Sequence, residues 1–453
     1  MERLLLLLFA IATFTIWKSL TMISSQHEDN APANAVFRPP RPRVSNNGNH
    51  SKSTDATTKP YFILHIGPPK TATTYIQCNL QKLSKGLAED DSYYFVGKNC
   101  PNTKAEMQNG EKSIPGHFLM MGLNDANPHN RGYDLLKARM DYHRLKGDNM
   151  IYSNEALTNH LIDQNSTWDC FQTMLSGWNV RVVIGYRHYF DWIRSFYYQT
   201  HKQNQKLHQK WPNQGNGKPH PSFISFLDYH IRRRESGDLS IDGGFQNEAY
   251  GHHLTLSAYN KYSPHFDDIQ FLNMYDDEDL ITDFVCRILS DADKTCRKVR
   301  TVTNEGKERY GVAKRSSQSF DAYRISEAAF HKGYITTSSP KEVVVEMVSK
   351  KIEEIGMKAL SEFITCPSPS LVARLLKVSI DCENEMIEIS QGDTSASEKE
   401  KAKNEHISMY RKSEAEDRFC DLDPKLILKD DTWVSFLTKI GKETAKSSTN
   451  NDH

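Results

Sequence analysis

Short apolar runs that alternate with helical patterns predict an α/β fold in the first two thirds of the chain. Four runs rich in aromatic and β-branched residues predict strands, at 61–66, 148–153, 180–186 and 269–274. Apolar positions at helical spacing predict helices within 76–83, from about 190, and within 254–262 and 280–288. The run VRVVIGY is nearly continuous, as in strands that helices cover on both faces. We therefore predict a central parallel sheet flanked by helices.

The pattern after residue 300 predicts helices only. Apolar residues within 344–359 lie along one helical face, and the polar segment 391–406 (QGDTSASEKEKAKNEH) interrupts the helical pattern. We expect that segment to be a solvated, charged loop. The folded chain is thereby divided into an α/β domain over 60–300 and a mostly helical carboxyl-terminal extension over 301–453.

An apolar run near the amino terminus predicts entry into the secretory pathway. Residues 4–17 carry no charge, but at about 1.5 Å per residue they cover only about 21 Å of the ~30 Å hydrocarbon core. Two interpretations remain: a signal anchor over 1–23, in which Lys18 snorkels to the interface, or a cleaved signal peptide. Because no A-x-A-like cleavage site follows the run, we favour the anchor. Both interpretations place the rest of the chain in the secretory lumen.

Residues 24–59 have almost no large apolar side chains and are dense in Pro, Ser, Asn and Thr. Such a segment cannot bury enough surface to fold, so we predict a disordered stem. The N-x-[ST] triplets at Asn49 and Asn165 are glycosylation sequons, which agree with a luminal chain.

Charge and cysteine content exclude several classes of protein. The 453 residues include 57 Lys+Arg and 57 Asp+Glu, and a chain without net charge is not expected to coat nucleic acid. No later window is long and apolar enough to span a bilayer, which excludes a multi-pass membrane protein. The eight cysteines form no C-x-x-C pair, so no structural zinc site is predicted. A luminal address allows a disulfide among Cys366, Cys382 and Cys420.

The loop after the first strand has the composition of a phosphate-binding loop. The segment 67–74 (GPPKTATT) joins the strand to a helix, so backbone N–H groups and a helix amino terminus can face an anion. Lys70 adds a full charge, while Thr73 and Thr74 add hydroxyl donors. The loop is not a Walker A motif, because Pro69 stands where that motif requires glycine before its lysine.

A second cationic position follows the strand 180–186. Arg187 stands at its carboxyl end, and Ser195 follows eight residues later on the next predicted helix. Ligands of open α/β sheets bind at the carboxyl ends of strands, where an arginine and a serine can hold a second phosphate.

Together these motifs resemble the sulfotransferases that use 3′-phosphoadenosine-5′-phosphosulfate (PAPS). PPKTATT is similar to the family's 5′-phosphosulfate loop, and YRHYFDWIRSFYY is similar to its 3′-phosphate motif, in which Arg and Ser stand eight residues apart. Ala72 stands where glycine is usual, and the third, Gly-rich nucleotide motif of the cytosolic enzymes has no match. Alanine is tolerable there if its backbone dihedrals are helical. The resemblance covers about residues 60–290 and implies a P-loop NTPase-like sulfotransferase fold.

The resemblance also implies a set of site residues and partners. PAPS would be the co-substrate, its 5′ side held by Lys70, Thr71, Ala72, Thr73 and Thr74, and its 3′-phosphate by Arg187 and Ser195. No metal is expected there, because Lys70 and backbone amides neutralise the phosphate charge. The acceptor would be a glycan or another hydroxyl compound, reached from the Golgi membrane by an anchored chain or outside the cell by a secreted one.

The acceptor also needs a general base, for which two residues are candidates. Glu155 follows the predicted strand 148–153, and His117 lies in the segment SIPGHFLMMG. Related glycan sulfotransferases use either Glu or His, and we favour His117. We interpret His65, beside the loop, as a strand residue whose ring is satisfied by hydrogen bonds.

Two other classes of function remain open. A P-loop kinase would need an Mg²⁺-binding Asp after an apolar strand, and DNMIYSNE is a poor substitute. A luminal binding protein could keep the fold without any transfer activity.

Overall fold

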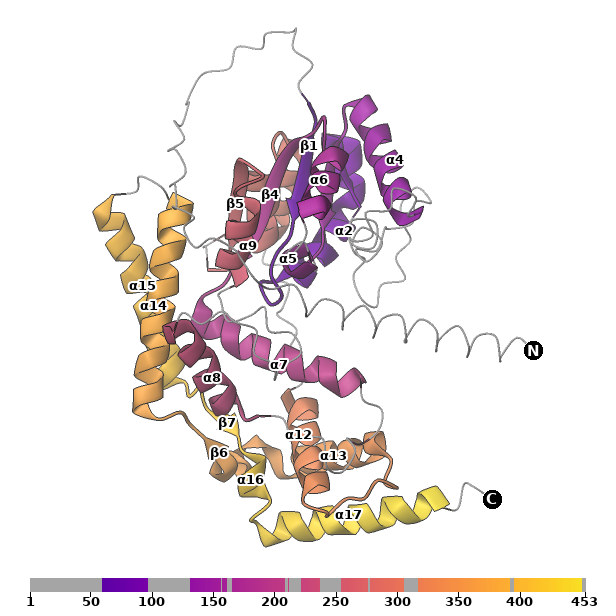
Figure 1. Cartoon of the computed structure of the whole chain (residues 1–453), viewed down its shortest axis with the longest axis vertical. Helices are drawn as coiled ribbons and strands as arrows, with labels where there is room; N and C mark the ends of the chain where they lie inside the picture. Colours follow the sequence, from indigo (N-terminus) through magenta and orange to yellow (C-terminus); the bar gives the residue numbers. More distant parts are fainter. Residues whose placement is uncertain are drawn as a thin grey trace, which may run out of the picture. The chain divides into compact units, whose positions relative to one another are not determined.

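A five-stranded parallel β-sheet with helices on both faces forms the first part of the computed structural model (Figure 1). The structure describes residues 59–96, 131–155, 157–160, 165–207, 211, 221–236, 254–275, 278–304, 317–391 and 395–449. The predicted anchor, the stem up to residue 58 and the candidate base His117 lie outside the described residues. Within those residues, no helix combines the length and the hydropathy that a bilayer crossing requires.

The sheet has the strand order β2-β3-β1-β4-β5, and all neighbouring strands are parallel. Its strands are β1 (Tyr61–His65), β2 (Tyr93–Phe95), β3 (Asn149–Ser153), β4 (Asn179–Tyr186) and β5 (Asp268–Asn273). The register places Ile63 of the central strand between Ile151 and Arg181. The predicted parallel sheet is thus confirmed. Strand β2 was not predicted, since three residues are too few to show a period.

Helices cover the two faces of the sheet. They are α2 (Thr73–Asp91), α4 (Arg131–Lys146), α5 (Leu157–His160), α6 (Asn165–Met174), α9 (Leu254–Tyr262), α10 (Leu280–Asp283) with the π-helical turn η2 (Phe284–Ile288), and α11 (Asp293–Asn304). Helices α7 (Tyr189–Leu207) and α8 (Phe223–Ser236) follow β4 and pack together in a separate cluster. One hydrophobic cluster joins Leu64 to α4, α6 and α9, and another joins Ile63 to α2, α10 and α11. Neighbouring residues of β1 are therefore buried in opposite layers, as the strand period of two requires.

The connection after β1 covers one face of the sheet, and the connections between the other strands beside it place helices on the opposite face. Helix α2, after β1, packs with α10 and α11, whereas α6, between β3 and β4, and α9, just before β5, pack on the opposite face. In open α/β sheets, ligands bind outside the carboxyl ends of strands at such a divergence. The carboxyl end of β1, between those of β3 and β4, is therefore where a site is expected.

The carboxyl-terminal part is mostly helical. Its helices are α12 (Ser317–His331), α13 (Lys341–Ala359), the 3₁₀ turn η3 (Ser361–Phe363), α14 (Pro369–Gln391), α15 (Ala396–Ala415), α16 (Pro424–Ile427) and α17 (Asp431–Thr449). The expectation of helices only was wrong, because β6 (Ile364–Thr365) pairs antiparallel with β7 (Asp421–Leu422). That pairing involves two residues on each side, too few for a recognisable strand pattern.

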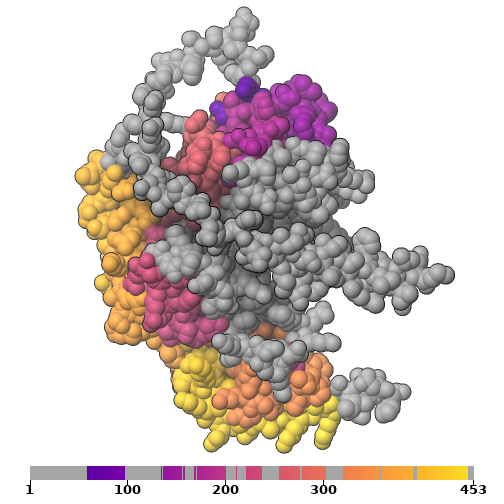
Figure 2. All heavy atoms as spheres, viewed as in Figure 1, coloured from indigo at the N-terminus to yellow at the C-terminus, as the bar shows by residue number. Residues whose placement is uncertain are grey.

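The predicted charged loop over 391–406 was also wrong. Helix α14 extends to Gln391, and α15 begins at Ala396. A capping box starts α15: Ser395 accepts a hydrogen bond from the backbone of Glu398, whose side chain bonds back to the backbone of Ser395. The Lys, Glu and Ala residues that follow have high helix propensity, so the segment needs no broad apolar stripe. Atoms of α14 and α15 form part of the visible surface (Figure 2).

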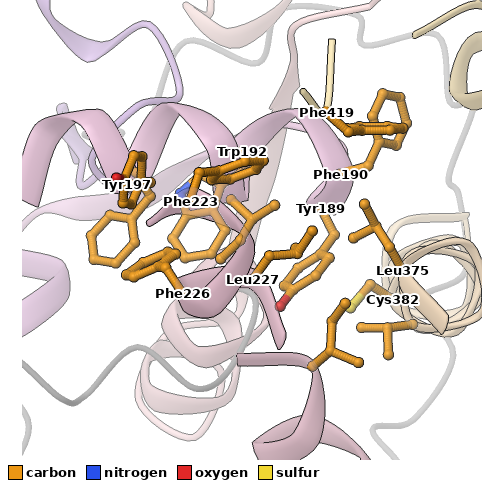
Figure 3. Packing of buried hydrophobic residues seen from close by; sticks show 14 of the residues in the cluster. Tyr189, Phe190, Trp192, Tyr197, Phe223, Phe226, Leu227, Leu375, Cys382 and Phe419 are labelled. Carbon is orange, nitrogen blue, oxygen red and sulfur yellow. The ribbon is translucent and has the colours of Figure 1, made fainter. Parts of the chain in front are cut away.

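An aromatic cluster joins α7 and α8 to α14 (Figure 3). Tyr189 and Trp192 of α7 are almost fully buried, as are Phe226 of α8 and Leu375 and Cys382 of α14. Aromatic side chains bury large apolar areas, so this cluster contributes strongly to holding these helices together. It also brings α14 against the segment that follows β4.

Disulfides are present in both parts of the chain. Cys366 is bonded to Cys420, and Cys382 is buried without a disulfide, which resolves the pairing left open among these three. Cys286 is bonded to Cys296, and Cys78 is also disulfide-bonded. Disulfides of this kind persist in oxidising compartments.

Candidate functional site

The β1–α2 loop has an unusual backbone at the carboxyl end of β1. Lys70 and Ala72 both adopt positive φ angles, 74° and 61°. Such left-handed conformations cost a residue with a Cβ roughly 1–2 kcal/mol, and glycine avoids this cost. The condition stated for Ala72, ordinary helical dihedrals, is therefore not met: the loop holds the left-handed shape that the usual glycine would favour.

Hydrogen bonds inside the loop hold this shape. The Thr71 hydroxyl donates to the carbonyl of Pro68 at 2.7 Å, and the Thr71 backbone N–H donates to the same carbonyl at 3.2 Å. The Thr73 hydroxyl lies 3.4 Å from the carbonyls of Gly67 and Pro68. Both threonines are buried. Their hydroxyl groups therefore stabilise the loop itself, whereas Thr74 is exposed.

Helix α2 begins at the end of this loop without a side-chain cap. Ala72 occupies the cap position and has no side chain that could accept a hydrogen bond from the first turn. The first N–H groups of a helix carry partial positive charge, so an uncapped helix start beside a lysine is suited to an anion. Thr74 in that first turn is the exposed hydroxyl nearest in sequence to this position.

The neighbouring strand supports the loop through a glycine. A Cβ on Gly185 of β4 would lie 2.8 Å from the Cβ of Thr71 and 3.2 Å from its carbonyl oxygen. Real Cβ atoms do not approach side chains and backbone so closely. Gly185 is thus required for the loop to pack against β4.

We expect Gly185→Ala to displace the loop and to lower the unfolding free energy by about 1–3 kcal/mol, as overpacking does. Gly86→Ala, in α2, is the matched control, because its Cβ would lie 3.7 Å from the nearest atom. That substitution should stabilise the helix by about 0.5–1 kcal/mol. Urea unfolding of both variants measures the difference. Equal stabilities would contradict the close packing of loop and strand.

Arg187 links the end of β4 to the loop. Its Nη1 donates to the carbonyl of Lys70 at 3.2 Å, and its Nε and Nη2 donate to Asp191 Oδ2 at 3.0 and 2.7 Å. The side chain is 12% exposed. Trp192 also reaches the loop, its indole N–H donating to the carbonyl of Pro69 at 3.1 Å. The structure therefore brings together two residues that the sequence analysis selected separately, Lys70 and Arg187.

Asp191 anchors the guanidinium of Arg187. It also accepts hydrogen bonds from Arg418 at 2.8 Å and from the Tyr275 hydroxyl at 3.0 Å. Burial opposes its ionisation, but the charges of Arg187 and Arg418 outweigh burial and hold the pKa of Asp191 below its usual value. Asp191 was not predicted from the sequence, although an Asp four residues after an Arg at a helix start is a recognisable ion-pair spacing. Trp192 had no comparable signal.

Two other predicted site residues, Ser195 and Glu155, lie outside the β1–α2 loop. Ser195 lies in α7 two turns beyond Arg187 and is buried. Glu155 is half-buried in the turn after β3. This turn lies beside the loop, because the backbone N–H of Asn154 donates to the carbonyl of His65 at 2.9 Å and the Thr158 hydroxyl donates to the carbonyl of Ile66. Glu155 therefore belongs to the same edge of the sheet as Lys70.

His65 is buried beneath the loop. Its Nδ1 lies 2.8 Å from the hydroxyl oxygen of Ser153, while its Nε2 has no hydrogen-bond partner in the described part of the chain. The prediction of a satisfied ring is thus correct for one nitrogen only. Burial lowers the pKa of His65 to about 4, so the imidazole is neutral at physiological pH. A Cβ on Gly67 would lie 2.9 Å from Nε2, so the loop backbone approaches the ring closely.

Comparison of the chain with family models, curated proteins and solved structures found no match.

Proposed function

We propose that this protein is a sulfotransferase, which transfers the sulfuryl group of PAPS to a hydroxyl or amine acceptor in the secretory lumen. The observation that carries the proposal is the contact of Arg187 with the loop of Lys70, at the carboxyl ends of two adjacent parallel strands. Two cationic residues at this edge suit a ligand with two separate phosphate groups.

The residues at the site fit such a nucleotide. The uncapped start of α2, the charge of Lys70 and the exposed hydroxyl of Thr74 would hold the 5′ side. Arg187 donates to Asp191 and to the Lys70 carbonyl, and these contacts hold the guanidinium at the edge of the sheet where we propose that the 3′-phosphate binds. Ser195 is the second residue proposed for that phosphate.

For sulfuryl transfer, the protein mainly has to position the two reactants and to stabilise the negative charge on the leaving group. Bound PAPS would supply an activated sulfuryl group and a phosphate leaving group. Lys70 would stabilise the negative charge that develops on the leaving side. A base beside the acceptor would contribute about 10²- to 10⁴-fold, and the candidates remain His117 and Glu155. Of these, Glu155 lies at the described edge of the sheet.

The loop is poorly suited to the alternative, a P-loop kinase. In a Walker A motif the residue after the lysine offers its hydroxyl to Mg²⁺. The corresponding Thr71 is 1% exposed and donates that hydroxyl to Pro68. Lys70 and backbone amides are proposed to neutralise the phosphate charge without a metal.

A glycan is the proposed acceptor, because the apolar run at residues 4–17 predicts a luminal chain and the loop resembles those of glycan-modifying enzymes. An anchored chain would work from the Golgi membrane. No nucleic acid is proposed as a partner of this chain, which has no net charge.

The test is transfer from radiolabelled PAPS by the full chain, offered a panel of glycans, tyrosine peptides and small alcohols. We expect label on a hydroxyl-bearing glycan, at a rate unchanged when Mg²⁺ is added to an Mg²⁺-free buffer. Transfer from ATP that requires Mg²⁺, without transfer from PAPS, would establish the kinase instead. Tight binding of adenosine 3′,5′-bisphosphate without any transfer would indicate a non-catalytic binding protein.

A further inference from the structure

Three buried side chains from distant parts of the sequence converge beside Arg187. His188 follows β4, Glu383 belongs to α14 and His406 to α15. The two Nδ1 atoms are 2.8 Å apart, and Glu383 Oε2 lies 3.0 Å from His188 Nδ1 and 2.9 Å from His406 Nδ1. Their side chains are 7%, 9% and 1% exposed. The three atoms form a nearly equilateral triangle inside the protein.

When Glu383 is ionised, hydrogen bonding alone cannot satisfy the three contacts of this triangle. An imidazole nitrogen either donates a proton or accepts one, never both. If both nitrogens donate to Glu383, two N–H groups face each other at 2.8 Å. If one nitrogen donates to the other, the accepting nitrogen has no proton and its lone pair also faces the carboxylate oxygen of Glu383, which repels it. While Glu383 is ionised, at least one of the three short contacts is therefore unfavourable unless a cation lies between the three atoms.

The groups around the triangle are those that orient metal ligands. Ser379 Oγ lies 2.9 Å from Nε2 of His406, where it can accept that ring's other proton and leave Nδ1 unprotonated. The ring of Tyr275 stacks on His188 with centroids 3.8 Å apart. The Tyr186 hydroxyl donates to Glu383 Oε2 and lies 3.3 Å from His188 Nδ1.

We propose that His188, Glu383 and His406 bind a zinc ion that fastens α14 and α15 to the end of β4. Two neutral imidazoles and a carboxylate are a common ligand set for Zn²⁺. With bonds of about 2.0–2.1 Å, tetrahedral ligands lie ~3.3 Å apart, so the triangle needs to open by only a few tenths of an ångström. The fourth ligand would be the Tyr186 oxygen or a water molecule. Because the three side chains are buried, the ion would be structural, and it would fix the backbone next to Arg187.

The ligand set is tested by the metal content of the full chain, purified with a tag that contains no histidine. We expect about one zinc per chain by inductively coupled plasma mass spectrometry. The variants His188→Gln, Glu383→Gln and His406→Gln should each retain at least about tenfold less. His143→Gln is the matched control, because His143 is buried beside a single carboxylate, that of Asp148 at 3.1 Å. Its zinc content should equal that of the wild type.

X-ray absorption at the zinc edge of the wild-type protein keeps the test decisive if the variants do not fold. We expect the scattering of two imidazoles in a first shell at about 2.0–2.1 Å. A wild-type chain that holds no metal, and whose Tm does not rise when Zn²⁺ is added, would overturn the proposal. So would zinc without imidazole scattering, or full zinc content in His406→Gln. None of these measurements uses a substrate, so they do not depend on the proposed transfer reaction.

Discussion

Lys70→Ala is expected to abolish transfer of the sulfuryl group, with a loss of at least about a hundredfold in kcat/KM. The loop places Lys70 at the carboxyl end of β1, next to the uncapped start of α2. Alanine keeps the Cβ, so the cost of the left-handed backbone at this position does not change. The variant therefore removes the ammonium group without changing the backbone preference at this position. Transfer from PAPS at saturating acceptor measures the effect.

Lys85→Ala is the control for Lys70→Ala. Lys85 is an exposed lysine of α2, on the helix that follows the loop. Its replacement removes one positive charge but should leave transfer unchanged, because exposed charges contribute little at a distance. Equal rates for the two variants would show that Lys70 has no special role, and the assignment of the loop would be wrong.

The central part of the fold could be predicted because its strands are buried on both faces. Residues such as Ile63, Val182 and Ile184 form continuous apolar runs, which few other structures produce. The loop after β1 was recognisable for a related reason: a proline pair, a lysine and threonines between a strand and a helix leave few alternatives. Arg187 was predictable from its place at the end of β4.

Other features were not predictable because distant residues determine them. The left-handed backbone of Ala72 depends on the packing of Thr71 against Gly185, more than a hundred residues later. Asp191 lies only four residues after Arg187, but its second partner, Arg418, is 227 residues away. No local spacing brings Arg418 to Asp191.

Two features show the difference between a sequence signal that was overlooked and a feature for which the sequence holds no signal. The start of α15 had a signal, the Ser395–Glu398 capping-box spacing, which the lack of an apolar stripe obscured. The cluster of His188, Glu383 and His406 had none, because its members are 195 and 218 residues apart from His188. Metal motifs are found in sequences only when their ligands are close together.

Arg187→Ala is expected to weaken binding of adenosine 3′,5′-bisphosphate by about 2–5 kcal/mol, which is roughly thirtyfold to several thousandfold in Kd. The guanidinium is largely buried and is oriented by Asp191 and by the carbonyl of Lys70. Its loss removes the charge proposed for the 3′-phosphate and a support of the loop. Arg187→Lys keeps the charge without the planar fork and should bind with intermediate affinity. Isothermal titration calorimetry measures all three proteins.

Arg418→Ala separates phosphate binding from the support of Asp191. Arg418 donates to the same carboxylate as Arg187, at 2.8 Å, but its side chain is 45% exposed and makes no described contact with the loop. If Arg187 acts on the nucleotide, Arg418→Ala should change the affinity far less than Arg187→Ala. If the two variants lose the same affinity, both act only by holding Asp191 and the packing around it, and the 3′-phosphate must be held elsewhere. A difference of at least about 1.4 kcal/mol, or tenfold, would assign the phosphate contact to Arg187.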